Sequence, residues 1–169
     1  MIVTLRKLIP EDAEELLLLQ HKLDEESTFM LLEPDERKSG LQQVREMIED
    51  FVLAETSVLI GAEADGVLVG FMSLRGGSVR RNRHCAYVVV GISKQYQGMG
   101  IGTALFDAME EWAAEHCLIR IELTVMTHNQ RALDLYHKSG FRIEGTRVKS
   151  LKVDGCWVDE YYMGKIIEK

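Results

Sequence analysis

The sequence lacks the features that mark fibrous, membrane-spanning and secreted proteins. It has 2 prolines and 14 glycines among 169 residues, too few of either for a collagen-like or low-complexity chain. No stretch approaches the roughly 18 consecutive apolar residues of a membrane-spanning helix. Residues 1–10 lack the basic and apolar regions of a secretory signal. We therefore expect one domain over residues 1–169, in the cytoplasm, with no membrane contact.

Cysteine and histidine are scarce and scattered. The 3 cysteines, Cys85, Cys117 and Cys156, are odd in number and show no Cys-x-x-Cys spacing, which argues against a disulfide framework or a zinc knuckle. The 5 histidines have no ligand spacing with the cysteines or with one another. We expect free thiols in a reducing compartment and no metal site.

Basic side chains are outnumbered, with 20 lysines and arginines against 27 acidic residues and a net charge of −7. Nucleic-acid binding depends on neutralising phosphates, so we expect no nucleic-acid partner. Residues 1–56 carry 14 acidic and 6 basic side chains. This excess is typical either of a solvated helix face or of a surface that attracts a cationic partner. A basic cluster follows later, at Arg80, Arg81, Arg83 and His84. It is either a solvated loop or a contact for phosphates or an acidic partner.

The hydrophobic pattern predicts a mixed α/β protein. Apolar runs and alternation predict strands at 2–8, 57–63, 67–74, 85–92, 118–126, 141–153 and 156–166. Helical spacing predicts helices at 11–26, from Pro34 through Val52, from Ile101 past Trp112, and at 129–139. Asp-Gly steps at 65–66 and 154–155 predict two tight hairpins. In the strand over 118–126 we expect Ile119, Ile121, Leu123 and Val125 on one face, and the run at 85–92 is continuous enough for a central strand.

A glycine-rich segment lies between that central strand and the helix that begins near Ile101. It reads Gln97-Gly98-Met99-Gly100-Ile101-Gly102. Glycines at alternate positions let the backbone approach a ligand, and the helix N-terminus adds free N–H groups, so the segment suits a pyrophosphate. It has neither the Gly-Lys-Ser/Thr of a Walker loop nor the spacing of a dinucleotide fingerprint. Taken alone, it is also typical of a helix packed closely on a sheet.

A second motif extends from Asn129 to Phe141. With it, the chain resembles the GNAT superfamily of acetyl-CoA-dependent N-acetyltransferases. The family's cradle motif, Gln/Arg-x-x-Gly-x-Gly/Ala, is matched by Gln97, Gly100 and Gly102. Its second motif, Asn-x-x-Ala-x-x-Leu-Tyr-x-x-x-Gly-Phe, is matched by Asn129, Ala132, Leu135, Tyr136, Gly140 and Phe141. The predicted element order also agrees from the first strand to the last. The resemblance implies a single GNAT domain with a mostly antiparallel twisted sheet flanked by helices.

The resemblance also implies an enzyme that moves the acetyl group of acetyl-CoA, as cosubstrate, directly to a primary amine. The backbone of Val88, Val89 and Val90 would pair with the pantetheine arm where this strand splays from its neighbour. An N–H near Val90 would face the oxyanion. Asn129 would bind the arm, and the Tyr136 phenol would act as acid toward the thiolate. The N–H groups of the glycine-rich segment would hold the pyrophosphate, namely those of Gln97, Gly98, Met99, Gly100, Ile101 and Gly102.

The catalytic base is not fixed by the resemblance. Several family members carry a glutamate early in the strand before the cradle, but the matching position here is Ala86. Glu33 takes its place as the candidate, because the loop between the first two helices lines the acceptor site in this family. Glu122 and ordered water are alternatives, and Glu122 is equally typical of a strand carboxylate paired with Arg75 or Arg120.

The acceptor is open as well. The acidity of residues 1–56 favours a small cationic, polyamine-like amine. A protein N-terminal amine, as in ribosomal-protein acetylation, is the alternative, and a non-catalytic acyl-CoA-binding module is a third. Small domains of this kind commonly form homodimers, which makes a homodimer one candidate assembly.

Overall fold

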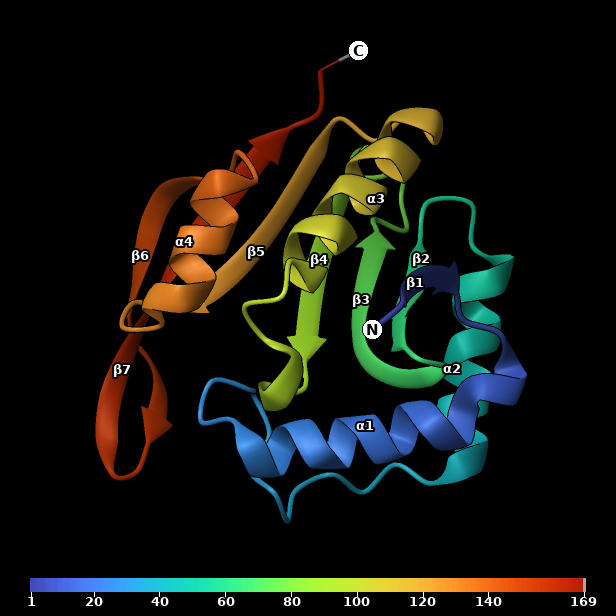
Figure 1. Ribbon diagram of the computed structural model, residues 1–169. Helices are drawn as coiled ribbons and strands as arrows, with labels where there is room; N and C mark the ends of the chain where they lie inside the picture. The colour runs from blue at the N-terminus through green and yellow to red at the C-terminus, as the bar shows by residue number, and fades with distance from the viewer. Residues whose placement is uncertain (169) are drawn as a thin grey trace.

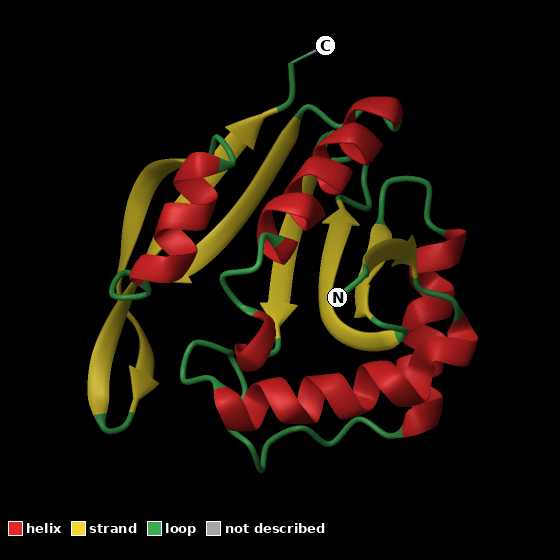
Figure 2. Cartoon of the chain, in the orientation of Figure 1, coloured by secondary structure: helices red, strands yellow, loops and turns green. Residues whose placement is uncertain are grey.

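The computed structural model describes residues 1–168 and contains one seven-stranded sheet in the order β1-β2-β3-β4-β5-β7-β6. Neighbouring strands are antiparallel except for β4 and β5, which are parallel. Figures 1 and 2 show helices packed around this twisted sheet. The strands are β1 Val3–Lys7, β2 Val58–Ala64, β3 Val67–Gly76, β4 Cys85–Ile92, β5 Arg120–Met126, β6 Arg142–Val153 and β7 Cys156–Ile166. The α-helices are α1 Ala13–Glu26, α2 Leu41–Leu53, α3 Ile101–Glu115 and α4 Gln130–Lys138, with short 3-10 turns at Pro10–Asp12 and Lys94–Tyr96.

Two hydrophobic cores lie on opposite faces of the sheet. Side chains alternate along β3, so Met72 and Leu74 join the core under α3 and α4, whereas Phe71 joins the core under α1 and α2. Within residues 1–168, the second core has no member from β5, β6 or β7. The face of these three strands that points away from α3 and α4 is therefore left open, and Tyr162 on it is 49% exposed.

The two Asp-Gly hairpins form as predicted. Asp65 and Gly66 have φ of 49° and 82°, and Asp154 and Gly155 have φ of 49° and 78°. Two successive left-handed residues are the signature of the two-residue turn that matches the twist of a hairpin. The helix over 129–139 also forms, and Gly140 ends it with a φ of 91°.

Two local predictions are wrong. The second helix begins at Leu41, not at Pro34, because Gly40 caps it and donates its N–H to the Gln43 side chain at 2.8 Å. Ile119 lies outside β5 and is 38% exposed, while Leu118 is 1% exposed and takes the core position. The Ile119 N–H is instead bonded to the His84 carbonyl as the chain enters the strand.

Candidate active site

The parallel strands β4 and β5 separate after a short stretch of pairing. Their register covers Cys85 with Arg120, Ala86 with Ile121, and Tyr87 with Glu122. Residues 88–90 continue to pair with β3 on one side and have no partner on β5. Main-chain groups on this free edge of β4 can hydrogen-bond an extended ligand as an added strand would.

The glycine-rich segment follows the end of β4 and leads into α3. Gly98 and Gly100 have φ of 76° and 83°, and a Cβ on either would meet nothing within 4 Å. These glycines therefore serve backbone conformation and not packing. Gly100 caps α3 and accepts the Ala104 N–H at 3.0 Å. The N–H groups of the first helical turn, starting at Ile101, are left without intrahelical partners, which suits an anion such as a pyrophosphate.

Gly102 has a different reason to be glycine. It is buried, and a Cβ there would lie 2.8 Å from Leu135 Cδ2 on α4. Close packing of α3 against α4 therefore explains Gly102, and backbone freedom explains Gly98 and Gly100. The packing interpretation is thus confirmed at Gly102, while pyrophosphate binding at the other two glycines stays a prediction.

The side chain of Gln97 organises the segment from within. Its Nε2 donates to the Ile92 carbonyl at 3.0 Å, and its Oε1 accepts from Arg131 at 3.2 Å. The Gln97 side chain thus ties the end of β4 to the start of α4. Sequence reasoning missed Arg131, whose exposed guanidinium lies beside the segment; its place two residues after Asn129 in the second motif was the available signal.

Asn129 and Tyr136, the two motif residues for which a role is predicted, lie at α4, on the same side of the sheet as α3. Asn129 caps α4, where its side-chain oxygen accepts the Ala132 N–H at 3.3 Å, so its amide group keeps two N–H donors for a ligand. Tyr136 packs edge-on against Phe106 at 5.6 Å between ring centroids. Burial raises the pKa of Tyr136 to about 12, and the nearby Tyr87 phenol adds a smaller contribution in the same direction.

Tyr87, like Val89, is an exposed β4 side chain on the face of the sheet away from α3. Ala86 is 2% exposed in the core under α3, so a longer side chain at that position would point into the core. Tyr87 is 40% exposed, and its hydroxyl lies 2.7 Å from Thr124 Oγ1 on β5. A cavity of about 110 Å³ lies here, lined by Tyr87, Arg120, Glu122, Leu123, Thr124, Tyr162 and Met163.

One arginine in this cavity is shared by two carboxylates. Arg120 Nε donates to Glu122 at 3.0 Å, and Arg120 Nη1 donates to Glu144 at 2.9 Å. These contacts raise the pKa of Arg120 and lower that of Glu144. The three groups together carry one net negative charge. The alternative pairing of Glu122 with Arg75 does not occur, because Arg75 stacks on the Phe51 ring at 4.2 Å.

The loop between α1 and α2 carries Glu33 and reaches the segment that joins β5 to α4. The Phe29 ring lies 5.1 Å from the His128 ring, so this loop contacts the segment between β5 and α4. Glu33 is exposed; its N–H donates to the Glu36 side chain at 2.8 Å, and its carboxylate has no ion-pair partner among residues 1–168.

Part of the acidic excess of residues 1–56 is structural. Asp12 forms a two-pronged contact with Arg6 at 2.7 Å, and Asp24 is bound by Arg37. Glu26, at the end of α1, accepts the Lys94 N–H at 2.8 Å and so anchors α1 to the turn before the glycine-rich segment. These three carboxylates therefore have partners inside the protein.

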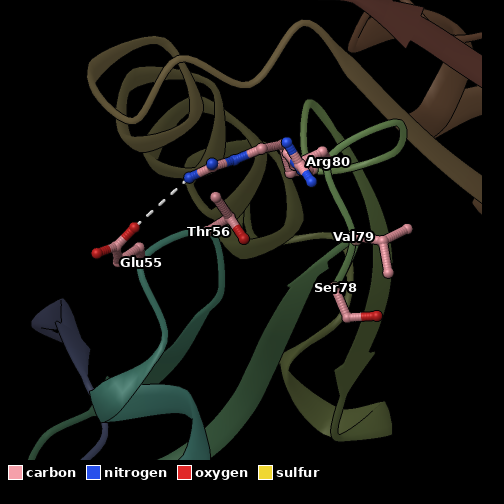
Figure 3. A pocket seen from close by; sticks show the side chains of 7 residues that line it. Glu55, Thr56, Ser78, Val79 and Arg80 are labelled. Atoms are coloured by element: carbon pink, nitrogen blue, oxygen red, sulfur yellow. Dashed lines mark ion pairs between the residues drawn. The ribbon is translucent and has the colours of Figure 1, made fainter.

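A larger cavity, of about 360 Å³, lies at the other end of β4 (Figure 3). It is lined by Glu55, Thr56, Gly77, Ser78, Val79, Arg80 and Arg83, and so includes two members of the basic cluster noted in the sequence, Arg80 and Arg83. Arg83 and Glu55 form a 3.6 Å ion pair. An eight-residue strand spans roughly 26 Å at about 3.3 Å per residue. A pyrophosphate at residues 97–102 is therefore out of reach of this basic cluster.

Across residues 1–168, no group of three or more histidine, cysteine, aspartate or glutamate side chains is arranged to hold a metal ion. In the same residues, no helix combines the length and apolar character needed to cross a bilayer.

Residues 19–141 match the model of the Acetyltransferase (GNAT) family. The Escherichia coli L-amino acid N-acetyltransferase AaaT is 34% identical over 103 residues, which cover 60% of this chain and 64% of that protein. The Mycobacterium tuberculosis N-alpha-acetyltransferase RimI is 33% identical over 62% of this chain and 63% of its own length. The chain thus spans less than two thirds of either relative. The E. coli spermidine N(1)-acetyltransferase is 25% identical over 88% of this chain and 79% of its own.

The same fold occurs in a crystal structure of a GNAT-family acetyltransferase from Streptococcus pneumoniae. The two superpose with a TM-score of 0.95 at 29% identity, covering 98% of this chain and all of the other. The mixed, mostly antiparallel sheet flanked by helices that the sequence predicted is thereby confirmed.

Proposed function

The chain belongs to the GNAT family of acetyl-CoA-dependent N-acetyltransferases, and on that premise we propose that its acceptor is a small cationic primary amine. The observation that carries this proposal is the shared arginine, Arg120, which lies opposite Cys85 where β4 and β5 are still paired. Arg120 is held by Glu122 and Glu144 at once, and this group of three side chains at the edge of the cavity carries one net negative charge. A cationic amine is drawn to a group of net negative charge, and the face of Tyr87 adds cation–π attraction, whereas the Tyr162 ring already lies 5.5 Å from the Arg147 guanidinium.

The loop between α1 and α2 supports a small acceptor over a peptide. Its Phe29 contacts His128 and thereby joins two segments that lie on either side of the separated strands. A peptide would need an open groove along this path, whereas a slender alkylamine needs only the cavity. The exposed carboxylate of Glu33 on the same loop adds attraction for a cation.

The residues of the glycine-rich segment and of β4 fit acetyl-CoA. Left-handed Gly98 and Gly100, with open space around them, leave the N–H groups at the start of α3 free for its pyrophosphate. The free β4 edge at Val88–Val90 is our candidate for pairing with the extended pantetheine arm, and Asn129, whose side-chain oxygen caps α4, is our candidate for donating to that arm's carbonyls. Acetyl-CoA supplies the activated acyl group as a thioester, and an N–H near Val90 is our candidate for stabilising the oxyanion.

The acceptor must lose a proton before it can attack. For an alkylamine with a pKa near 10.4, the neutral form at pH 7 costs about 4.6 kcal/mol, at about 1.36 kcal/mol per pKa unit. Partial desolvation in the cavity lowers this cost. The sequence names Glu33 as the candidate for the base, with Glu122 as the alternative; because Glu33 is exposed while Glu122 lines the cavity, we favour Glu122.

Tyr136 is our candidate for stabilising the leaving thiolate. Because its pKa is raised to about 12, the phenol stays protonated at neutral pH and can donate a hydrogen bond to sulfur. Full proton transfer to a thiolate with a pKa near 8.5 would cost about 5 kcal/mol across that difference in pKa. We therefore assign Tyr136 the role of hydrogen-bond donor, with the final proton coming from solvent.

A panel of amines tests the acceptor class. Purified protein is given acetyl-CoA with polyamines, L-amino acids or short peptides at equal concentration, and free thiol is measured over time. We expect the polyamines and diamines to give the highest kcat/KM. Turnover of peptides or amino acids with no turnover of polyamines would overturn the proposal, and no turnover of any amine would favour the binding-module interpretation.

A further inference from the structure

Two hydroxyl groups meet across the point where β4 and β5 separate. Tyr87 is in the last paired position of β4, opposite Glu122, and Thr124 is two residues further along β5. The Tyr87 hydroxyl nevertheless reaches Thr124 Oγ1 at 2.7 Å. This bond therefore crosses the beginning of the gap in which the acyl group and the amine must meet.

The pair is placed to act on a ligand. Tyr87 is 40% exposed and Thr124 is half-buried, and both line the cavity of about 110 Å³ that Glu122 also lines. Such a volume has room for water, since one water needs only about 10–15 Å³ of probe-occupied space. Tyr87 also lies within electrostatic reach of Tyr136, which approaches from the other face of the sheet.

A phenol alone is not a base at neutral pH, because it can take a proton only by giving one away. Two hydroxyl groups followed by a carboxylate remove this difficulty, because each hydroxyl oxygen accepts one proton as it donates its own, and the carboxylate accepts the last. Glu122 supplies the carboxylate: it stands opposite Tyr87, Arg120 holds it at 3.0 Å, and its side chain is 45% exposed. It can therefore accept a proton and release it to solvent.

We propose that Tyr87, Thr124 and Glu122 form the proton relay that deprotonates the acceptor amine. The ammonium proton moves to the Tyr87 oxygen as the Tyr87 proton moves to Thr124. The Thr124 proton then passes through water to Glu122 and on to solvent. The amine lone pair forms the C–N bond, the second ammonium proton leaves by the same route, and the C–S bond breaks with its electron pair on sulfur. One proton returns from solvent to sulfur, so each turnover releases one proton.

The relay rests on the proposed function only in requiring an amine in this cavity, so its test uses whichever amine of the panel is turned over fastest. We expect Tyr87→Phe and Thr124→Val each to lower kcat by about 10- to 100-fold near pH 7. The double variant is expected to lose no more than the worse single variant, because both break one chain. The loss should shrink as pH rises toward the pKa of the amine, since solvent then removes the proton.

Conservative variants distinguish a role in the proton relay from a purely structural role. Thr124→Ser keeps the hydroxyl and should retain activity close to wild type, and Tyr161→Phe removes a phenol on the α4 face of the sheet and should change nothing. Affinity for acetyl-CoA, measured by calorimetry, should stay within about twofold in Tyr87→Phe. An unchanged kcat and pH profile in Tyr87→Phe, multiplicative losses in the double variant, or a loss confined to acetyl-CoA affinity would each overturn the relay.

Discussion

Gly102 and Leu135 fix the spacing between α3 and α4. A Cβ on Gly102 would lie 2.8 Å from Leu135 Cδ2 and 3.4 Å from Ile92 Cδ1. The helix that starts in the glycine-rich segment is thereby held against the helix that carries Asn129 and Tyr136. The two motifs seen in the sequence are thus joined by a direct packing contact.

This contact predicts the effect of Gly102→Ala. The added methyl group must push the Leu135 side chain aside, and overpacking of this kind costs about 1–3 kcal/mol. Because the obstacle is the end of a flexible side chain, we expect the lower part of that range in the free energy of unfolding, measured with urea. In the double variant Gly102→Ala/Leu135→Ala, the clash is removed, so its loss in the free energy of unfolding should be smaller than the sum of the losses in the two single variants. Losses that simply add would contradict this explanation.

Tyr136→Phe is expected to lower kcat by tenfold or more while leaving affinity for acetyl-CoA nearly unchanged. The hydroxyl contributes a hydrogen bond to the leaving sulfur, whereas the ring keeps its packing against Phe106. Steady-state kinetics and calorimetry measure the two quantities. An unchanged kcat would remove Tyr136 from the mechanism.

The raised pKa of Tyr136 also predicts a pH dependence of stability. Its pKa is about 12 in the folded protein against 10.0 for the free group, so the folded state keeps this proton longer than the unfolded state. The resulting stabilisation is present below pH 10 and is lost as pH rises toward 12. Over that window, unfolding measurements should show wild type losing stability faster than Tyr136→Phe. Parallel curves for the two proteins would contradict the burial argument.

Steady-state kinetics with a cationic acceptor distinguish the roles proposed for Glu33 and Glu122. We expect Glu33→Gln to raise the acceptor KM several-fold with little change in kcat, because an exposed carboxylate acts by attraction. Glu122→Gln should lower kcat, most strongly at low pH. Glu49→Gln, an exposed carboxylate on α2, is the matched control for loss of charge. A large fall in kcat in Glu33→Gln would make Glu33 the base.

Local signals in the sequence were sufficient for much of the fold. The Asp-Gly turns, the helix stop at Gly140 and the order of strands and helices depend on neighbouring residues, and all form as predicted. The start of α2 was misjudged because Pro34 and Gly40 both look like helix beginnings, and only Gly40 is followed directly by the apolar stripe of the helix.

The site was predicted less completely, because its contacts join distant parts of the chain. Tyr87 and Thr124 are 37 residues apart, and Glu26 binds Lys94 across 68 residues. Neither pair has a spacing that sequence patterns reveal. Along β4, a count that differs by one residue also exchanges the two faces, which is why Ala86 was considered where Tyr87 faces the cavity.

The most direct test of the account is a calorimetric titration of acetyl-CoA into wild type, Gly98→Ala and Gly66→Ala. Both glycines have positive φ, 76° and 82°, and open space around them, so alanine introduces similar backbone strain at each, about 1–2 kcal/mol. Only Gly98 lies in the segment proposed to hold the pyrophosphate. We predict that wild type and Gly66→Ala bind acetyl-CoA alike and that Gly98→Ala binds at least tenfold more weakly. Equal affinity in all three proteins, or no binding by wild type, would contradict the account.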